Sequence, residues 1–299
     1  MQYTNEQQII VNNIKVNYDS FGDPAHPAMI LIMGLATQMI FWDSDMCRQI
    51  ALQGFWVIRF DNRDIGKSSK MTQAKIPHGL AFMLNVLLGK KINSSYQLRD
   101  MAADTLGLMD TLHISRAHIV GASMGGMIAQ LMAIEAPQRI ISLTSIMSTT
   151  GNRSLPRASN CTILKLMAAR AKNVDAYVKK GLQIWKILHA GFYPFDVEKV
   201  RQLLTQSWQR GVSAAGISRQ LAAILASPDR SADLANVQVP ALVIHGDIDP
   251  LLPLACGIAT AKAIPNAKLV TYSGMGHTIP QEIQQEVLSE IVCLAKQAR

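Results

Sequence analysis

The chain has 299 residues, of which 49% are hydrophobic, so it is long and apolar enough to bury a sizeable core and is not an intrinsically disordered protein. Its formal net charge is +8, and the whole excess of Lys and Arg over Asp and Glu falls within residues 151–233. These cations are spread along helix-like stretches without an arginine-rich run, which argues against a nucleic-acid partner and favours a solvated helix face. An anionic substrate or a membrane surface is the alternative interpretation of this charge.

Targeting and cysteine patterns favour a cytoplasmic protein. The first residues lack the basic and apolar regions of a signal peptide, and no apolar run reaches the roughly 18 residues of a membrane span, so we expect no stable membrane insertion. The four cysteines, Cys47, Cys161, Cys256 and Cys293, stand far apart and form no C-x-x-C pair. This spacing argues against a zinc site and gives no positive case for disulfides.

The order of predicted elements indicates an α/β protein. Residues 7–22 alternate like a β-hairpin and end at a turn signal, Gly22-Asp23-Pro24. Six short, β-branched apolar segments then resemble strands buried on both faces of a sheet, at 28–33, 55–60, 117–122, 139–147, 241–245 and 267–272. Amphipathic, helix-like stretches alternate with them, at 43–53, 95–113, 125–136, 254–264 and 280–298. Strand followed by helix, repeated, predicts a mostly parallel sheet with helices on both faces.

The alternation is interrupted between residues 151 and 233. Helix-like segments occupy this part of the chain, at 162–172, 174–188, 197–209 and 217–226. Because the strand pattern resumes at Ala241, the segment is interpreted as a helical insertion into a continuing sheet. We therefore predict a core domain of residues 1–150 and 234–299 and an inserted domain of residues 151–233.

The pentapeptide Gly121-Ala122-Ser123-Met124-Gly125 lies where a predicted strand gives way to a predicted helix. Flanking glycines permit a sharp, strained turn that lifts a serine hydroxyl above the sheet, over the positive end of a helix. The pattern predicts that Ser123 is a nucleophile. The alternative is a tight turn that merely uses small residues.

A serine nucleophile needs a base and a group that orients the base. His277 follows the last predicted strand and a Gly-x-Gly turn, at the edge where open α/β sheets bind ligands. Structural positions are expected for the other histidines, His26, His78, His113, His118, His189 and His245. Asp247 and Asp249 both follow the strand at 241–245. Asp249 is favoured as the orienting acid, because Asp247 can brace the loop through backbone hydrogen bonds.

These motifs together resemble the α/β-hydrolase superfamily along nearly the entire chain. The stretches LIMGLATQMIFWD, VIRFDNRDIGKSS, GASMGGMIAQ, HGDIDPLLP and GMGH look most like the branch of aclacinomycin methylesterase-like carboxylic-ester hydrolases. The order Ser123, Asp249, His277 is that of the triad in this fold. The resemblance implies an eight-stranded, mostly parallel sheet, with the helical insertion forming a cap over the site.

The resemblance also implies an oxyanion hole. Its two donors would be the backbone N–H groups of Leu35 and Met124, with Gly34 allowing close approach. Many relatives carry a histidine before that glycine, where this chain has Met33, which removes a polar brace without removing the donors. The alternative is that Gly34 merely ends a strand.

Residues 61–69 invite a comparison with phosphate-binding loops, since Gly66-Lys67-Ser68 is the tail of that motif. The full pattern requires a glycine where this chain has Asp61, so a nucleotide site is not predicted. Asp61, Arg63 and Ser68 are interpreted as structural residues.

The predicted activity is that of a serine carboxylesterase for small to medium acyl esters, acting through a covalent acyl-enzyme and needing no metal or organic cofactor. A peptidase, a lactonase or a carbon–carbon bond hydrolase would use the same triad. A non-catalytic ligand-binding protein is the alternative from a different class. Gly34, Trp42 and Trp185 are candidate substrate contacts. Further aromatic and apolar residues of the insertion could line an acyl pocket or form its core: Met167, Ile187, Phe192, Tyr193 and Trp208.

Overall fold

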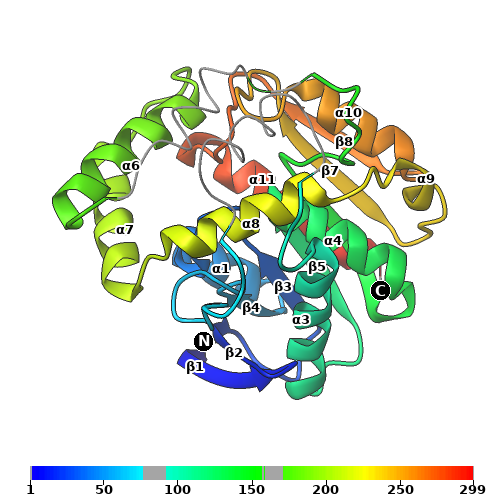
Figure 1. Ribbon diagram of the computed structural model, residues 1–299. Coiled ribbons are helices and arrows are strands. Elements are labelled where there is room, and N and C mark those ends of the chain that lie inside the picture. Colours follow the sequence, from blue (N-terminus) through cyan, green and yellow to red (C-terminus); the bar gives the residue numbers. More distant parts are fainter. Residues whose placement is uncertain (1, 77–91, 157, 159–170, 299) are drawn as a thin grey trace.

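The computed structural model describes residues 2–76, 92–156, 158 and 171–298 (Figure 1). Its centre is one eight-stranded sheet with the order β1-β2-β4-β3-β5-β6-β7-β8. The strands are β1 (Tyr3–Val11), β2 (Ile14–Phe21), β3 (Ala28–Ile32), β4 (Trp56–Phe60), β5 (Ala117–Ala122), β6 (Ile140–Ile146), β7 (Ala241–Gly246) and β8 (Lys268–Tyr272). Among these strands, the pairs β1–β2 and β2–β4 are antiparallel and the other neighbouring pairs are parallel. The predicted fold class is confirmed.

The first two strands form the predicted hairpin. Asn12 and Asn13 join them with φ angles of 48° and 63°. A two-residue turn with positive φ at both positions matches the twist of antiparallel strands, and asparagine tolerates that conformation better than most residues.

The central strands are buried on both faces, as their apolar sequences predict. Every residue of β3, β5 and β7 is buried. The prediction is wrong for the last strand, since Lys268 is exposed and the three following residues of β8 are at least partly exposed. β8 pairs only with β7 and forms an edge of the sheet, so less of its surface is covered.

Helices cover both faces of the sheet. α1 (Ser44–Leu52) and α11 (Gln281–Gln297) pack on one face through an apolar cluster that includes Ile50 and Val287. The other face carries α3 (Leu98–Thr111), α4 (Met124–Glu135), α9 (Ser231–Leu234) and α10 (Leu254–Ala263). Two short 3-10 helices, η1 (Met39–Phe41) and η2 (Pro137–Arg139), complete the core.

Between β6 and α9, the described residues form the helices α6 (Val174–His189), α7 (Val197–Arg210) and α8 (Ala214–Ala226). α6 and α7 pack side by side, while α8 crosses in front of the sheet (Figure 1). A Cβ at Gly181 would lie 2.7 Å from the side chain of Leu204, so this glycine permits the close approach of α6 and α7. The helix expected at 162–172 lies outside the described residues.

The basic insertion is not simply a solvated helix face. Arg210, Arg219 and Arg230 are 8%, 2% and 1% exposed. Arg210 pairs with Asp61 and Arg219 pairs with Asp64, so two arginines of the insertion bind carboxylates of the core. The prediction of a solvated helix face is therefore wrong for these three side chains, because each donates to a buried hydrogen-bond acceptor.

Over the part of the chain that the structure describes, no helix has the length and apolar character needed to cross a membrane.

Candidate active site

Ser123 occupies a strained turn between β5 and α4. Its φ of 55° and ψ of −117° are costly for a residue with a side chain. Two glycines make the turn possible. A Cβ at Gly121 would lie 2.1 Å from the carbonyl oxygen of Gly125, and a Cβ at Gly125 would lie 2.1 Å from that of Ile32. The turn has the geometry of a nucleophile elbow.

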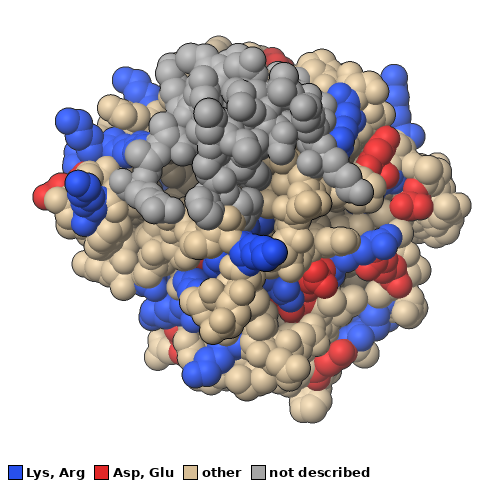
Figure 2. All heavy atoms as spheres, in the orientation of Figure 1, with Lys and Arg blue, Asp and Glu red and all other residues tan. Residues whose placement is uncertain are grey.

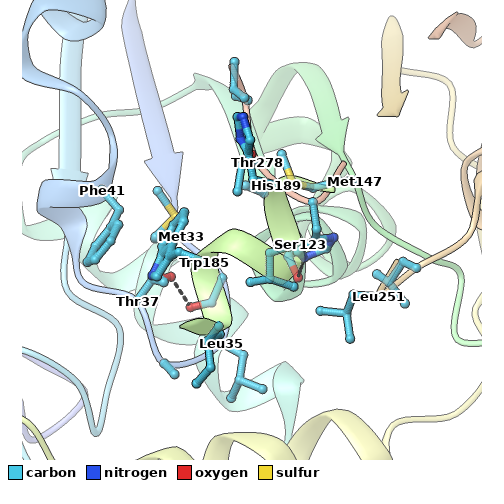
Figure 3. Close-up of a pocket in the computed structure, with 18 of the residues that line it drawn as sticks. Met33, Leu35, Thr37, Phe41, Ser123, Met147, Trp185, His189, Leu251 and Thr278 are labelled. Atoms are coloured by element: carbon cyan, nitrogen blue, oxygen red, sulfur yellow. Dashed lines mark hydrogen bonds between the residues drawn. The ribbon is translucent and has the colours of Figure 1, made fainter. Parts of the chain in front are cut away.

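Hydrogen bonds to the neighbouring strand end hold this turn in place. The backbone N–H of Ser123 donates to the carbonyl oxygen of Ile146 at 2.9 Å. The hydroxyl of Ser148 donates to the carbonyl oxygen of Ser123 at 2.8 Å. Both the amide and the carbonyl group of the serine are therefore fixed, and its side chain points into the cavity (Figure 3).

The imidazole of His277 bridges Ser123 and Asp249. His277 Nε2 lies 2.9 Å from Ser123 Oγ, and His277 Nδ1 lies 2.7 Å from Asp249 Oδ2. Because a carboxylate only accepts hydrogen bonds, Nδ1 carries the proton and Nε2 presents a lone pair to the serine hydroxyl. This is the protonation pattern that a general base requires.

Asp249 is held as an ionised carboxylate. Its Oδ1 accepts hydrogen bonds from the backbone N–H groups of Leu251 and Leu252, at 2.8 and 2.9 Å. Burial raises the pKa of Asp249, but His277 and these backbone donors outweigh burial and leave the pKa below its ordinary value. The carboxylate is therefore charged at neutral pH.

Asp247 lies nearby but makes different contacts. Its carboxylate accepts from the backbone N–H of Gly274 at 2.7 Å and from the hydroxyl of Ser273 at 3.1 Å. These bonds brace the loop that leads to His277. The structure thus brings Asp249, and not Asp247, to the imidazole.

The end of α6 contacts the loop that carries His277. The backbone N–H of His277 donates to the carbonyl oxygen of Leu188 at 2.6 Å. His189 Nε2 lies 3.1 Å from the carbonyl oxygens of Tyr193 and Pro194. Because carbonyl oxygens only accept hydrogen bonds, Nε2 carries the proton. Nδ1 of the same ring therefore accepts from the hydroxyl of Thr278, at 2.9 Å. Sequence reasoning placed His189 at a structural position, and no sequence signal indicated its contact with the residue after His277.

Two other histidines are buried and bind groups other than the serine hydroxyl. His118 Nδ1 lies 2.8 Å from Ser142 Oγ. His245 Nε2 donates to the carbonyl oxygen of Leu252 at 2.7 Å, which supports the turn after Asp249. Both have the structural roles expected of them.

Parallel strand pairing places the residues after β3 beside the elbow. Ile32 pairs with Gly121, so the chain leaves both strands at the same edge of the sheet. A Cβ at Gly34 would lie 3.1 Å from Ser123 Cβ and 3.6 Å from Ser123 Oγ. Gly34 and Leu35 line the cavity with Ser123, and Met124 begins α4 directly after it.

A cavity of about 1170 Å³ opens above Ser123 (Figure 3). Its wall combines residues of the core and the inserted helices and is mostly apolar; the members include Met33, Leu35, Met127, Met147, Ile184, Leu188, Leu221 and Leu251. A pocket of this size and chemistry suits a small organic molecule with a large apolar part.

The predicted aromatic contacts divide into two groups. Trp185 lines the cavity and stacks on Phe41, with ring centroids 4.9 Å apart and an interplanar angle of 7°. Trp42 also borders the cavity, but it is only 2% exposed and belongs to the core.

Other aromatic and apolar candidates of the insertion do not line this cavity. They are Ile187, Phe192, Tyr193 and Trp208. Phe192 is 66% exposed, and Trp208 packs against Tyr177. Periodicity could not show which face of each helix turns toward Ser123. Met167 lies outside the described residues.

Charges of both signs border the cavity. Lys199 pairs with Asp43 at 2.7 Å, and Asp196 and Glu282 also belong to the lining. Figure 2 shows Lys and Arg dispersed among acidic and uncharged residues on the face that it displays.

The segment 61–69 supports the loops around the cavity. Asp61 is fully buried, and its carboxylate accepts from the backbone N–H groups of Met39 and Lys67 and from Arg210. Arg63 pairs with Asp104 at 2.6 Å, and the hydroxyl of Ser68 donates to the carbonyl oxygen of Asp61. The structural roles expected of this segment agree with these contacts.

Comparisons with known proteins place this geometry in context. Residues 27–280 match the sequence model of a family described as the alpha/beta hydrolase fold. The chain is 25% identical to rhodomycin D methylesterase DnrP of Streptomyces peucetius, over 92% of each chain. It is 26% identical to a putative carbamate hydrolase, RutD, of Caulobacter sp. (strain K31), over 91% of this chain and 94% of that one. The crystal structure of an enol-lactonase from Burkholderia xenovorans LB400 superposes with a TM-score of 0.74 at 22% identity, covering 97% of this chain and 100% of that chain. The similarity to a methylesterase bears out the resemblance noted from the motifs.

Proposed function

The chain belongs to the alpha/beta hydrolase fold family, and from this premise we propose that it is a serine hydrolase that cleaves carboxylic esters through a covalent acyl-enzyme on Ser123. The observation that carries the proposal is the continuous hydrogen-bonded chain from Ser123 Oγ through the imidazole of His277 to Asp249. The similarity to rhodomycin D methylesterase supports an ester as the substrate.

Acylation begins with attack of Ser123 Oγ on the carbonyl carbon of the ester. The hydroxyl proton passes to His277 Nε2, and Asp249 stabilises the imidazolium that forms. The tetrahedral intermediate collapses when the carbon–oxygen bond to the leaving alcohol breaks, and the alcohol takes the proton from Nε2. The products of this half-reaction are the free alcohol and an acyl ester on Ser123.

Deacylation repeats the steps with water. His277 Nε2 takes a proton from the attacking water and then returns a proton to Ser123 Oγ as the acyl–serine bond breaks. The carboxylic acid leaves and the enzyme returns to its starting state.

We assign the oxyanion hole to the backbone N–H groups of Leu35 and Met124. Gly34 lies close enough to Ser123 for this role, and Met124 is the first residue of a helix whose positive end faces the serine. Loss of one such donor costs about 3 kcal/mol of transition-state stabilisation in serine hydrolases.

We propose that residues 151–233 act as a cap over the site. α6 and α8 add apolar lining to that of the core, including Trp185 and Leu221. With a cavity of about 1170 Å³, the enzyme has room for an ester larger than a simple acetate. A medium-sized ester with a bulky apolar acyl or alcohol group is the substrate that this lining favours.

Covalent labelling tests the activity directly. A fluorophosphonate should label the wild-type protein at Ser123 and leave S123A unlabelled. A panel of nitrophenyl esters of increasing chain length, run beside lactones, aminoacyl amides and carbon–carbon bond substrates, then identifies the reaction class. A folded wild-type protein that takes no label and turns over none of the panel would instead be a ligand-binding member of the fold.

A further inference from the structure

Three consecutive peptide groups beside Ser123 each have a polar side chain bound to them. Residues 33–36 carry these groups, and we call them the oxyanion loop. The side-chain amide of Asn62 donates to the carbonyl oxygen of Met33 at 3.0 Å. The peptide groups on either side of Leu35 are bound by Thr37 and Gln220, respectively.

Thr37 fixes the peptide group that contains the Leu35 N–H. Its hydroxyl donates to the carbonyl oxygen of Gly34 at 2.9 Å (Figure 3). A peptide bond is planar and trans, so the carbonyl of Gly34 and the N–H of Leu35 point in opposite directions. A hydrogen bond that fixes the direction of the Gly34 carbonyl therefore also fixes the direction of the Leu35 N–H. It also polarises the peptide group, which makes the N–H a stronger donor.

Gln220 fixes the next peptide group from the inserted helix α8. Its Oε1 accepts from the backbone N–H of Ala36 at 3.2 Å, and its Nε2 donates to the carbonyl oxygen of Arg63 at 2.9 Å. Gln220 is fully buried. Ala36 has a φ of 62°, a conformation that an alanine keeps only when its surroundings hold it.

We propose that Thr37 and Gln220 are positioning residues for the oxyanion donor at Leu35. The inference rests on the function proposed above and adds that one brace comes from the cap. Many relatives in the family carry a histidine where this chain has Met33, so that polar brace is absent here. The side chains of Asn62, Thr37 and Gln220 bind the oxyanion loop instead. The oxyanion hole is complete only while α8 is docked on the core.

The test for Thr37 compares the variants T37V and T37S with T105V. Thr105 is the control for the hydrogen bond, because its hydroxyl also donates to a backbone carbonyl, at 3.1 Å within α3. Thr105 is fully buried, whereas Thr37 is partly buried. We expect T37V to lower kcat by about 10- to 100-fold with little change in KM. T37S should retain most of the activity, and T105V should match the wild type.

Inhibition by a trifluoromethyl ketone separates positioning from general support of the fold. The ketone forms a tetrahedral adduct with an active serine, and its oxyanion occupies the same donors as the transition state. Its affinity for T37V should fall in proportion to kcat/KM. Thermal unfolding of each variant shows whether it is folded.

Gln220 is tested with Q220L, and Q130L is the matched control. Gln130 is equally buried and hydrogen-bonded, but its partners are Ser145 and Arg230. We expect Q220L to lose kcat and ketone affinity together, while Q130L retains both. If the wild type is active and folded T37V and Q220L match it in both measurements, this inference is wrong and the proposed function stands. If the wild type neither takes the label nor hydrolyses any ester, the function fails and the inference fails with it.

Discussion

The guanidinium of Arg219 forms two parallel hydrogen bonds with the carboxylate of Asp64, at 2.6 and 2.8 Å. Both side chains are buried. Tyr96 and the backbone N–H of Met71 also donate to this carboxylate, so its charge is well compensated. The pair joins α8 of the insertion to the loop after β4, directly beside Gln220 and the oxyanion loop.

Removing the arginine from this pair should destabilise the protein. R219M leaves a buried carboxylate without its cation, which costs about 3–5 kcal/mol in the free energy of unfolding. R201M is the control, because Arg201 and Glu198 form an exposed pair 3.5 Å apart, and such pairs contribute less than about 1 kcal/mol. Urea unfolding measures both variants. Equal losses of unfolding free energy in the two variants would show that the buried pair stabilises the protein no more than the exposed pair does.

The same pair predicts a dependence of stability on pH. Burial raises the pKa of Asp64, but Arg219, Met71 and Tyr96 outweigh burial and leave the pKa below its ordinary value. A lowered pKa in the folded state contributes stability above the unfolded pKa of about 4, and this contribution is lost as the pH falls through the folded value. The difference in unfolding free energy between wild type and D64N should therefore be constant near neutrality and shrink below about pH 4. A difference that does not change down to pH 2 would contradict this linkage.

Asp249 and Asp247 should differ sharply in their effect on catalysis. D249N removes the charge that orients His277 and stabilises its imidazolium, so we expect kcat to fall by about 10³- to 10⁴-fold. D247N retains the shape of a side chain whose carboxylate accepts hydrogen bonds from Gly274 and Ser273, and it should lose less than about 10-fold. Steady-state kinetics with a nitrophenyl ester compares the two. Similar losses of kcat in both variants would contradict the assignment of Asp249 to the triad and of Asp247 to support of the loop.

Gly125 should tolerate no side chain. In G125A the new Cβ would lie 2.1 Å from the carbonyl oxygen of Ile32, and neither backbone segment can move without displacing Ser123. We expect a loss of more than about 3 kcal/mol in unfolding free energy. G54A is the control: Gly54 has a φ of 89° but nothing within 4 Å of the added Cβ. Its cost should be limited to about 1–2 kcal/mol of backbone strain, as measured by urea unfolding.

Local patterns made most of the fold predictable. A buried parallel strand has to be apolar along its whole length, and a surface helix has to be apolar on one face, so each element leaves a periodic signal in its own residues. The elbow at Ser123 is equally local, because the strain at one serine demands glycines within two positions of it. The edge position of β8 escaped prediction, since its residues resemble those of a central strand and only the strand order shows that one side is uncovered.

The sequence by itself determined the alternation of strands and helices, the helical stretch between the strands at 139–147 and 241–245 and the candidates Ser123, Asp249 and His277, because each depends on residues close together in the chain. Only the tertiary structure decided which arginines of the insertion are buried, that His189 contacts Thr278, and that Thr37 and Gln220 bind the loop beside Ser123. A hydrogen bond or an ion pair depends on distance and direction between two groups, and residues as far apart as Ala36 and Gln220 leave no trace of their contact in either local sequence.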